Sequence, residues 1–434
     1  MQKIIKSALP AAASEQSPRH VRAVVEEIIS AVRERGDEAV AEYSEMLDNW
    51  APDSFLLSQA EIERIIASVP KQTLDDIVTV QANVRGFARH QRDSLQDLEI
   101  EVQPGVFLGQ RSIPVSAVGA YVPGGRYPLL ASAHMTIVTA KEAGVQRVAA
   151  MTPAAGGVIP AASVAAMHLA GADEIYLLGG VQAVAALALG TETIAPVHML
   201  VGPGNAYVAE AKRQLFGEVG IDLFAGPTEV LIIADETADP FLVAVDLLSQ
   251  AEHGPDSPAV LITTSVAIAE AVIGEVEAQL QNLSTRDVAG AAWRDHGQII
   301  LVDSLDEAWT LADEFASEHV QVLTADPREG LRKLTNYGAL FLGENTCVSF
   351  GDKVIGTNHV LPTRLAARYT GGLWVGKFLK TVTFQEVSTL EAAAGLGELL
   401  GRAARAENFE GHARAGDARV ARVRGERPSW ALDA

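Results

Sequence analysis

Cysteine is almost missing from this sequence, because Cys347 is the only one among 434 residues. A single thiol excludes an internal disulfide, which is typical of proteins from a reducing compartment. The sequence also lacks an uninterrupted apolar run of membrane-spanning length, roughly 20 residues. Its first twenty residues lack the apolar segment of a signal peptide. We therefore expect a soluble, cytoplasmic protein.

Positive charge is scarce as well. The chain has 34 Lys and Arg against 55 Asp and Glu, which gives a formal net charge of −21. Nucleic-acid partners need basic clusters, so we expect neither a nucleic-acid nor a membrane partner. The Arg-rich exception is the segment 413–427, which we interpret as a solvated helix face or as an arm that contacts another subunit.

The dinucleotide fingerprint GxGxxG does not occur between a strand and a helix. Instead, residues 177–187 (LLGGVQAVAAL) and 201–212 (VGPGNAYVAEAK) place glycines between an apolar strand and a helix. Such turns favour an anion, because the first N–H groups of the helix point at it. Ordinary α/β domains also contain turns of this kind, so each turn by itself is weak evidence for an anion-binding site.

Repeated strand–turn–helix patterns between residues 116 and 342 predict parallel sheets covered on both faces. Hydrophobic residues make up 48% of a chain long enough for more than one core, so we expect several folded domains. Ser58 is expected to cap a helix that Pro70 ends. We predict a helical N-terminal segment, two α/β domains and a helical tail, over residues 1–100, 101–234, 235–380 and 381–434.

The segment 240–253 (PFLVAVDLLSQAEH) ends an apolar run with polar groups. Gln250 and His253 are three residues apart, so on a helix they share a face with Glu252 between them. Imidazole and amide or carboxylate oxygens are acceptable zinc ligands. The alternative interpretation is the solvated end of an ordinary helix.

Three further pairs combine an acid with a histidine. Glu318 and His319 stand just before a predicted strand. An acid beside an imidazole suits proton transfer near neutral pH. The alternative for that pair is a surface helix end, where the dipole favours histidine. The other pairs are Asp352 with His359, in a loop rich in Gly and Thr, and Glu407 with His412.

These stretches together resemble the histidinol dehydrogenase family over nearly the whole chain. The motifs that carry the resemblance follow the order and spacing of the family. They are residues 33–48, 118–125 (VGAYVPGG), 179–194, 201–213, 220–235, 246–257 (DLLSQAEHGPDS), 317–322 (SEHVQV) and 356–363 (GTNHVLPT).

The resemblance implies a zinc-assisted oxidation of a primary alcohol to a carboxylate, with NAD accepting two hydrides and an aldehyde held between the steps. It also implies an intertwined homodimer of incomplete Rossmann-like domains, in which the tail of one subunit completes the site of the other.

The resemblance also implies roles for single residues. His319 matches the general base, and Glu318 matches the group that activates water. The zinc ligands are matched by Gln250, His253, Asp352 and His412. Substrate-contacting positions are matched by His359 and Glu407, and NAD-contacting positions by Tyr121, Gln182 and Asn205.

Two positions depart from the biosynthetic members of the family. Thr228 replaces a serine, and His134 replaces an aliphatic residue. The loop after residues 356–363 also differs and carries Arg364, Arg368, Trp374 and Lys377. We expect these changes to cluster at the substrate pocket, where they would suit an anionic substrate. The alternatives are a core histidine bonded to a backbone carbonyl and a neutral Ser-to-Thr exchange.

A branch of the family shows such changes: the dehydrogenases that oxidise 2,3-dihydroxypropane-1-sulfonate to 3-sulfolactate. We expect this activity first and the oxidation of histidinol to histidine second. A catalytically inactive nucleotide-binding regulator is the alternative from another class. The complete set of predicted metal and catalytic residues speaks against it.

Overall fold

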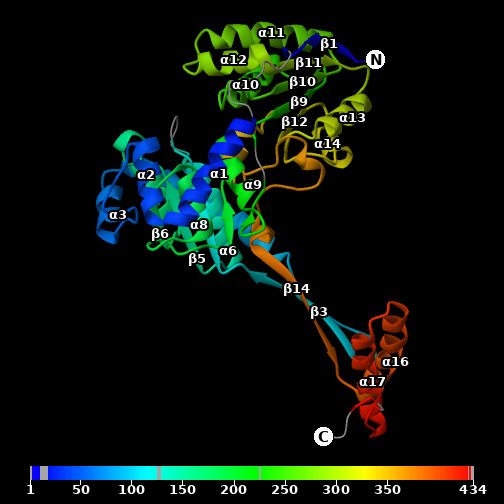
Figure 1. Ribbon diagram of the computed structural model, residues 1–434. Coiled ribbons are helices and arrows are strands. Elements are labelled where there is room, and N and C mark those ends of the chain that lie inside the picture. Colours follow the sequence, from blue (N-terminus) through cyan, green and yellow to red (C-terminus); the bar gives the residue numbers. More distant parts are fainter. Residues whose placement is uncertain (1, 10–17, 125–128, 224–225, 429, 432–434) are drawn as a thin grey trace. The chain divides into compact units, whose positions relative to one another are not determined.

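Three β-sheets organise the chain in the computed structural model, which describes residues 2–9, 18–124, 129–223, 226–428 and 430–431. Two sheets, built mainly of parallel strands, belong to a first unit, made of residues 1–92 and 115–378. The third sheet is antiparallel and belongs to a second unit, made of residues 93–114 and 379–434 (Figure 1). The predicted α/β class with parallel sheets is therefore confirmed.

The first sheet pairs its strands in the order β6-β5-β4-β7-β8, all parallel. The chain runs outward from the central β4 to one edge and then returns to build the other edge. The carboxyl ends of β4 and β7 therefore flank a switch point, where open α/β sheets bind ligands. The strands are β4 (Ala117–Tyr121), β5 (Arg147–Thr152), β6 (Glu174–Leu177), β7 (Met199–Val201) and β8 (Gly220–Ile221).

Helices connect and cover this sheet. Helix α5 passes into a π-helical turn, η1, before α6 continues, and such turns occur often at functional sites. The connecting elements are α5 (Leu130–Ala133), η1 (His134–Val138), α6 (Thr139–Ala143), η2 (Ala155–Gly157), α7 (Ala161–Ala170), α8 (Gly180–Leu189) and α9 (Ala206–Leu215).

The N-terminal helices complete the core around this sheet. Val25 and Val32 of α1 are buried in one apolar cluster with Val184 of α8. Ser58 caps α3 through a reciprocal bond pattern with Glu61, as predicted, but the helix ends before Pro70. These helices are α1 (Pro18–Arg35), α2 (Asp37–Asp48), α3 (Gln59–Ile66) and α4 (Lys71–Asp93).

The second sheet has the order β1-β11-β10-β9-β12-β13, and only β1 is antiparallel to its neighbour. Its strands are β1 (Lys3–Lys6), β9 (Val230–Ala234), β10 (Ala259–Thr263), β11 (Gly297–Leu301), β12 (His319–Leu323) and β13 (Ala339–Leu342). Strand β9 pairs with β10 and β12, although the predicted boundary left residues 230–234 in the first α/β domain. A local sequence pattern predicts a strand but not the strands that pair with it, which explains why the predicted domain boundary differs from the observed sheet.

Both faces of the second sheet are covered. Along β9, Ile232 packs into one apolar cluster, whereas Leu231 and Ile233 pack into another, because side chains alternate between faces. The helical elements after β9 in the first unit are α10 (Pro240–Ala251), α11 (Val266–Leu280), α12 (Arg286–His296), α13 (Leu305–Phe315), α14 (Pro327–Lys333), α15 (Val348–Lys353), η3 (Ala366–Arg368) and η4 (Val375–Phe378).

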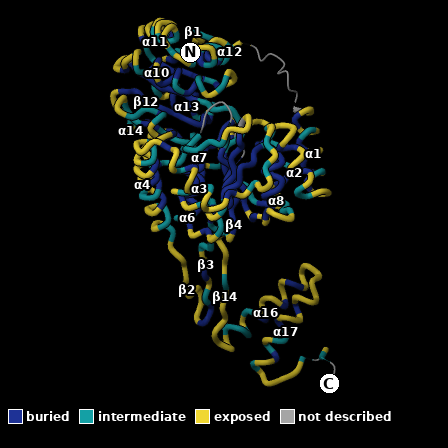
Figure 2. Tube along the Cα trace, turned by 90° about the vertical axis from the view of Figure 1, so that its left-hand side faces the viewer, coloured by how far each residue is buried: buried dark blue, intermediate teal, exposed yellow. Residues whose placement is uncertain are grey.

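The second unit joins three antiparallel strands to two helices. The strands pair in the order β14-β3-β2, and Figure 2 shows that most of their residues are exposed. The elements are β2 (Leu98–Gln103), β3 (Val106–Pro114), β14 (Leu379–Val387), α16 (Leu390–Ala406) and α17 (Glu410–Arg424). Two helices thus form most of the predicted tail. No helix in the described part of the chain is long and apolar enough to cross a membrane.

Candidate active site

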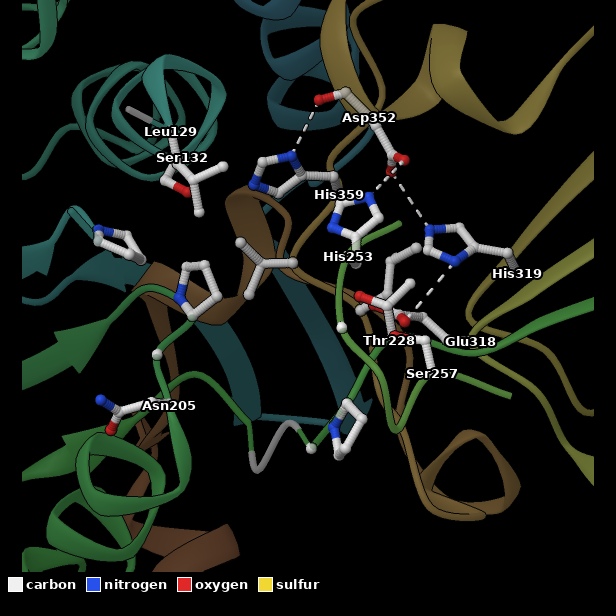
Figure 3. Close-up of a pocket in the computed structure, with 18 of the residues that line it drawn as sticks. Leu129, Ser132, Asn205, Thr228, His253, Ser257, Glu318, His319, Asp352 and His359 are labelled. Atoms are coloured by element: carbon white, nitrogen blue, oxygen red, sulfur yellow. Dashed lines mark hydrogen bonds and ion pairs between the residues drawn. The ribbon is translucent and has the colours of Figure 1, made fainter. Parts of the chain in front are cut away.

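A pocket of about 290 Å³ lies within the first unit (Figure 3). Turns that follow strands of the first sheet line one side, and elements around the second sheet line the other. Pro123 after β4 and Gly204 after β7 line it on the side of the first sheet. Many of the predicted site residues are brought together around it. Those that line it are Asn205, Thr228, His253, Glu318, His319, Asp352 and His359.

The turn after β7 requires glycine at its first position. Gly202 has φ 116°, and a Cβ atom there would lie 2.2 Å from the backbone oxygen of Tyr121 on β4. Asn205 then caps α9, because its side-chain oxygen accepts the N–H groups of Tyr207 and Val208 at 3.0 and 3.1 Å. The start of α9 is therefore held at the pocket wall, at the switch point of the sheet.

His319 is the first residue of β12, and Glu318 stands directly before it. The His319 Nδ1 atom lies 3.1 Å from the backbone oxygen of Glu229 and 3.6 Å from Glu318 Oε2. Its Nε2 atom lies 3.3 Å from Asp352 Oδ1. The imidazole thus stands between two buried carboxyl groups, and the interpretation of this pair as a surface helix end is wrong.

This arrangement shifts the pKa of all three groups. Burial works to lower the pKa of His319, but Glu318 and Asp352 outweigh it and raise the pKa to about 9. Burial raises the pKa of Glu318 to about 8, although His319 works in the opposite direction. Burial also works to raise the pKa of Asp352, but contact with His319 overcomes it and lowers that pKa. Titrating groups held this close are typical of proton-transfer sites.

Asp352 also connects two predicted metal ligands. Gln250 Nε2 donates to Asp352 Oδ2 at 2.9 Å, and His253 Nε2 lies 4.0 Å from the same oxygen. Gln250 lies in the last turn of α10, whereas His253 follows the end of that helix. The shared face predicted for a continuous helix is thus replaced by a turn that still brings both side chains to Asp352.

The residues present fit a divalent cation. Gln250 is almost fully buried, and its Oε1 atom has no hydrogen-bond partner in the described part of the chain. A buried acceptor without a donor is costly unless something else binds it. An amide oxygen, an imidazole and a carboxylate also form an acceptable zinc donor set. Within the described residues, however, no three His, Cys, Asp or Glu side chains form a metal-holding group by themselves.

Comparison with known proteins decides the family. The sequence model described as histidinol dehydrogenase matches residues 11–420. The chain belongs to the histidinol dehydrogenase family.

Individual relatives in this family cover almost all of the chain. A histidinol dehydrogenase homolog of Shouchella clausii (strain KSM-K16) is 59% identical over 422 residues, which are 97% of this chain and 99% of the relative. The sulfopropanediol 3-dehydrogenase of Ruegeria pomeroyi (strain ATCC 700808 / DSM 15171 / DSS-3) is 47% identical over 412 residues, 94% of each chain. The crystal structure of histidinol dehydrogenase from Elizabethkingia anophelis aligns with a TM-score of 0.90 and 33% identity, covering 96% of this chain and 95% of that one. These names include both predicted activities and do not separate them.

The second unit carries two predicted site residues of the histidinol dehydrogenase pattern. Glu407 is the C-cap of α16, and His412 lies in the first turn of α17, with its ring 5.2 Å from that of Phe409. Both side chains are exposed. An exposed imidazole and an exposed carboxylate are each available to a ligand or to another chain. Their assignment to a site stays a prediction.

His359 lines the pocket from the loop after α15. Its Nδ1 atom lies 2.9 Å from the backbone oxygen of Asp352, and its Nε2 atom is buried without a hydrogen-bond partner among the residues that the structure describes. A carbonyl only accepts, so Nδ1 carries the proton of this bond and the neutral ring keeps a lone pair at Nε2. Burial lowers the pKa of His359, which favours the neutral ring.

His134 is buried and does not line the pocket. Its Nδ1 atom lies 3.0 Å from Nε2 of Gln81, an amide that also donates to the backbone oxygen of Ala166. Burial lowers the pKa of His134 to about 4, and neighbouring His359 works in the same direction. The ring is therefore neutral near pH 7 and does not supply the positive charge that we expected from the sequence. A role in substrate binding stays a prediction.

Two predicted NAD contacts, Tyr121 and Gln182, do not line the pocket. The Tyr121 hydroxyl accepts the N–H of Gly180 at 3.2 Å, and burial raises the pKa of Tyr121 to about 12. Gln182 is fully buried in α8 and donates to Asp48 at 3.2 Å. The Tyr121 hydroxyl therefore supports the glycine turn after β6, whereas Gln182 joins α8 to α2. Contact of both side chains with a nucleotide stays a prediction.

Several pocket residues were missed in the sequence. They are Ser132, Asp256, Ser257 and Lys353, along with the apolar Leu129, Val360 and Leu361. Asp256 and Ser257 stand in the segment that drew attention to His253, and Ser132 stands two residues before His134. Small hydroxyl and aliphatic side chains give no chemical signal by themselves, so only the fold reveals their position.

Proposed function

We propose that this member of the histidinol dehydrogenase family is a zinc-dependent, NAD-linked enzyme that oxidises a primary alcohol to a carboxylate through a bound aldehyde. The observation that carries the proposal is the buried group of Glu318, His319 and Asp352, with Gln250 and His253 beside it. A redox-inactive metal site beside a proton-transfer pair suits dehydrogenation in which the nucleotide takes the hydride.

His319 is assigned to take the proton of the alcohol as hydride leaves, because its ring is central in the group. Its Nδ1 atom lies 3.1 Å from the Glu229 backbone oxygen, and its Nε2 atom lies 3.3 Å from Asp352 Oδ1. Glu318 is assigned to activate water for attack on the aldehyde. A carboxyl with a pKa of about 8 can accept a proton from water and return it near neutral pH. Two oxidations on one carbon require groups that recycle in this way.

The zinc ligands in the first unit would be Gln250, His253 and Asp352, and His412 would supply the fourth. When bound, zinc would fix the substrate heteroatoms and offset the charge of Asp352. The Gly202–Asn205 turn and the glycine turn after β6 would receive NAD, because both stand at carboxyl ends of strands of the first sheet.

We propose a homodimer in which His412 and Glu407 of one subunit enter the site of the other. Support comes from their exposure at the start of α17 and at the end of α16. Gln250, His253 and Asp352 supply three donor groups in the first unit, one fewer than a structural or substrate-binding zinc site commonly uses.

The favoured substrate is 2,3-dihydroxypropane-1-sulfonate, with 3-sulfolactate as the product. The relative named sulfopropanediol 3-dehydrogenase supports this choice, as does the ammonium group of Lys353 at the pocket. His134 no longer supports it, because the ring is neutral. Histidinol is the second candidate, supported by the likeness to a solved histidinol dehydrogenase.

The test is NADH formation by the purified protein, supplied with zinc, on the two alcohols side by side. The proposal expects two NADH per molecule of the sulfonate and a higher kcat/KM for it than for histidinol. A higher kcat/KM for histidinol would make histidinol the substrate and leave the proposed type of reaction unchanged. No NADH from either alcohol would refute the proposed reaction.

A further inference from the structure

Ser132 lines the same pocket as the proton-transfer group, although nothing in the sequence pointed to it. It lies on α5, the first helix after β4, and its side chain is fully buried. Its hydroxyl has no hydrogen-bond partner among the described residues. Leaving a buried hydroxyl unpaired costs free energy, so such a group at a pocket wall calls for a partner from the ligand.

The neighbouring hydroxyl on this stretch behaves differently. Thr136 donates to the backbone oxygen of Ser132 at 2.6 Å and is satisfied within the helix. Ser163 on α7 is also buried and has no partner in the part of the chain that the structure describes, but it does not line the pocket. An unpaired hydroxyl alone is therefore not a sign of binding here. The position of Ser132 at the pocket is what distinguishes it.

A second unpaired polar atom faces the same pocket from another element. His359 Nε2 is buried and has no partner within the described residues, while Nδ1 of the same ring is held by the backbone oxygen of Asp352. Ser132 and His359 reach the pocket from the first and the second sheet regions respectively, and both are labelled in Figure 3. One ligand in the pocket can therefore satisfy both.

The chemistry of the two atoms limits what that ligand presents. The neutral imidazole offers a lone pair at Nε2, which accepts a hydrogen bond. The serine hydroxyl both donates and accepts. A hydroxyl or amine group satisfies this pair, because it donates to the imidazole and accepts from, or donates to, the serine. A group that only accepts would leave the imidazole unpaired.

We propose that Ser132, together with His359, binds a second polar group of the alcohol substrate, a hydroxyl or an amine, and so selects substrates that carry one. This inference rests on the proposed function, because it assumes that the pocket binds the alcohol. It makes Ser132 a specificity-determining residue for alcohols with a neighbouring hydrogen-bond donor, and it applies to diols and to amino alcohols alike.

The experiment pairs each alcohol with an analogue that lacks the second group. The diol 2,3-dihydroxypropane-1-sulfonate is compared with 3-hydroxypropane-1-sulfonate, and histidinol with the same alcohol lacking its amine. Ser132→Ala is measured beside wild type, with Ser163→Ala as the matched control, on the full chain supplied with zinc. The readouts are kcat/KM for NADH formation and the Kd of each alcohol by calorimetry.

For the alcohol that the wild type oxidises, Ser132→Ala should lower kcat/KM by about tenfold, the effect of one lost hydrogen bond. It should change kcat/KM for the analogue by less than about twofold, and Ser163→Ala should change neither. An equal loss on both compounds, or no loss on either, would overturn the subsite and indicate that the hydroxyl binds only water or supports the fold.

The two hypotheses fail in different ways. If neither alcohol yields NADH but the second polar group still improves binding to the wild type and not to Ser132→Ala, the proposed reaction is refuted and the subsite is supported. If neither alcohol binds to the wild type, the subsite is refuted as well.

Discussion

Replacing Lys212 by Met removes the cation from a buried ion pair behind the pocket wall. Lys212 Nζ donates to the Gly202 oxygen at 2.9 Å and to Asp222 Oδ1. Asp222 Oδ2 accepts the Gly202 N–H at 2.8 Å. The pair thus holds both polar groups of Gly202, the residue that opens the turn toward Asn205.

The size of the effect follows from burial. The side chains of Lys212 and Asp222 are 6% and 0% exposed. Removing one partner of such a pair leaves an uncompensated charge and costs about 3–5 kcal/mol of the free energy of unfolding. At roughly 2 °C per kcal/mol for a large domain, the melting temperature should fall by about 6–10 °C. The double variant Lys212→Met/Asp222→Asn should recover part of this loss, because no charge is left alone.

The assay is thermal unfolding of wild type and variants, with Lys141→Met as the control. Lys141 pairs with Asp173 at the surface of the same sheet region, where the side chains are 22% and 42% exposed. Surface ion pairs contribute about 0–1 kcal/mol to the free energy of unfolding, so the melting temperature of the control variant should fall by no more than about 2 °C. A Lys212→Met variant that melts within the same range would refute the reasoning. The Kd for NAD should also rise in that variant, since the turn would loosen.

Four further outcomes are expected. His319→Asn should abolish NADH formation yet keep the Kd for NAD, and turnover close to wild type would exclude His319 as the base. Removal of metal by a chelator should stop turnover and added Zn²⁺ should restore it; metal-free protein with undiminished turnover would exclude a metal role. His134→Leu, measured as kcat/KM, should affect the sulfonate and an uncharged diol alike, because the ring is neutral; a loss confined to the sulfonate would restore the charge argument. Hydrogen bonding to Arg147 lowers the pKa of Glu174 below its ordinary 4.5, so this pair stabilises the fold above that pH and loses its effect as pH falls through the folded-state pKa. The gap in melting temperature between wild type and Arg147→Gln should then narrow from about pH 6 to about pH 3, and a constant gap would contradict this sign.

Local chemistry in the sequence was enough for part of this description. Alternating strands and helices predict parallel sheets, Ser58 predicts a cap, and Glu318 next to His319 predicts a proton-transfer pair, because each signal depends on neighbours within a few residues. The long shared motifs predicted the family, which the comparison confirms. Seven of the twenty residues that line the pocket were also predicted as site residues, since motif residues from distant segments converge there.

Long-range packing decided the rest. Strand β9 became the centre of the second sheet because it pairs with β10 and β12, partners that its own residues do not specify. The neutral state of His134 comes from burial, which lowers its pKa to about 4, and from His359, which lies far along the chain and works in the same direction. Ser132 is recognised as a site residue only from the fold, which places its side chain at the pocket wall. Charge state, strand pairing and pocket position depend on surroundings that come from far along the chain, so the tertiary structure alone determines them.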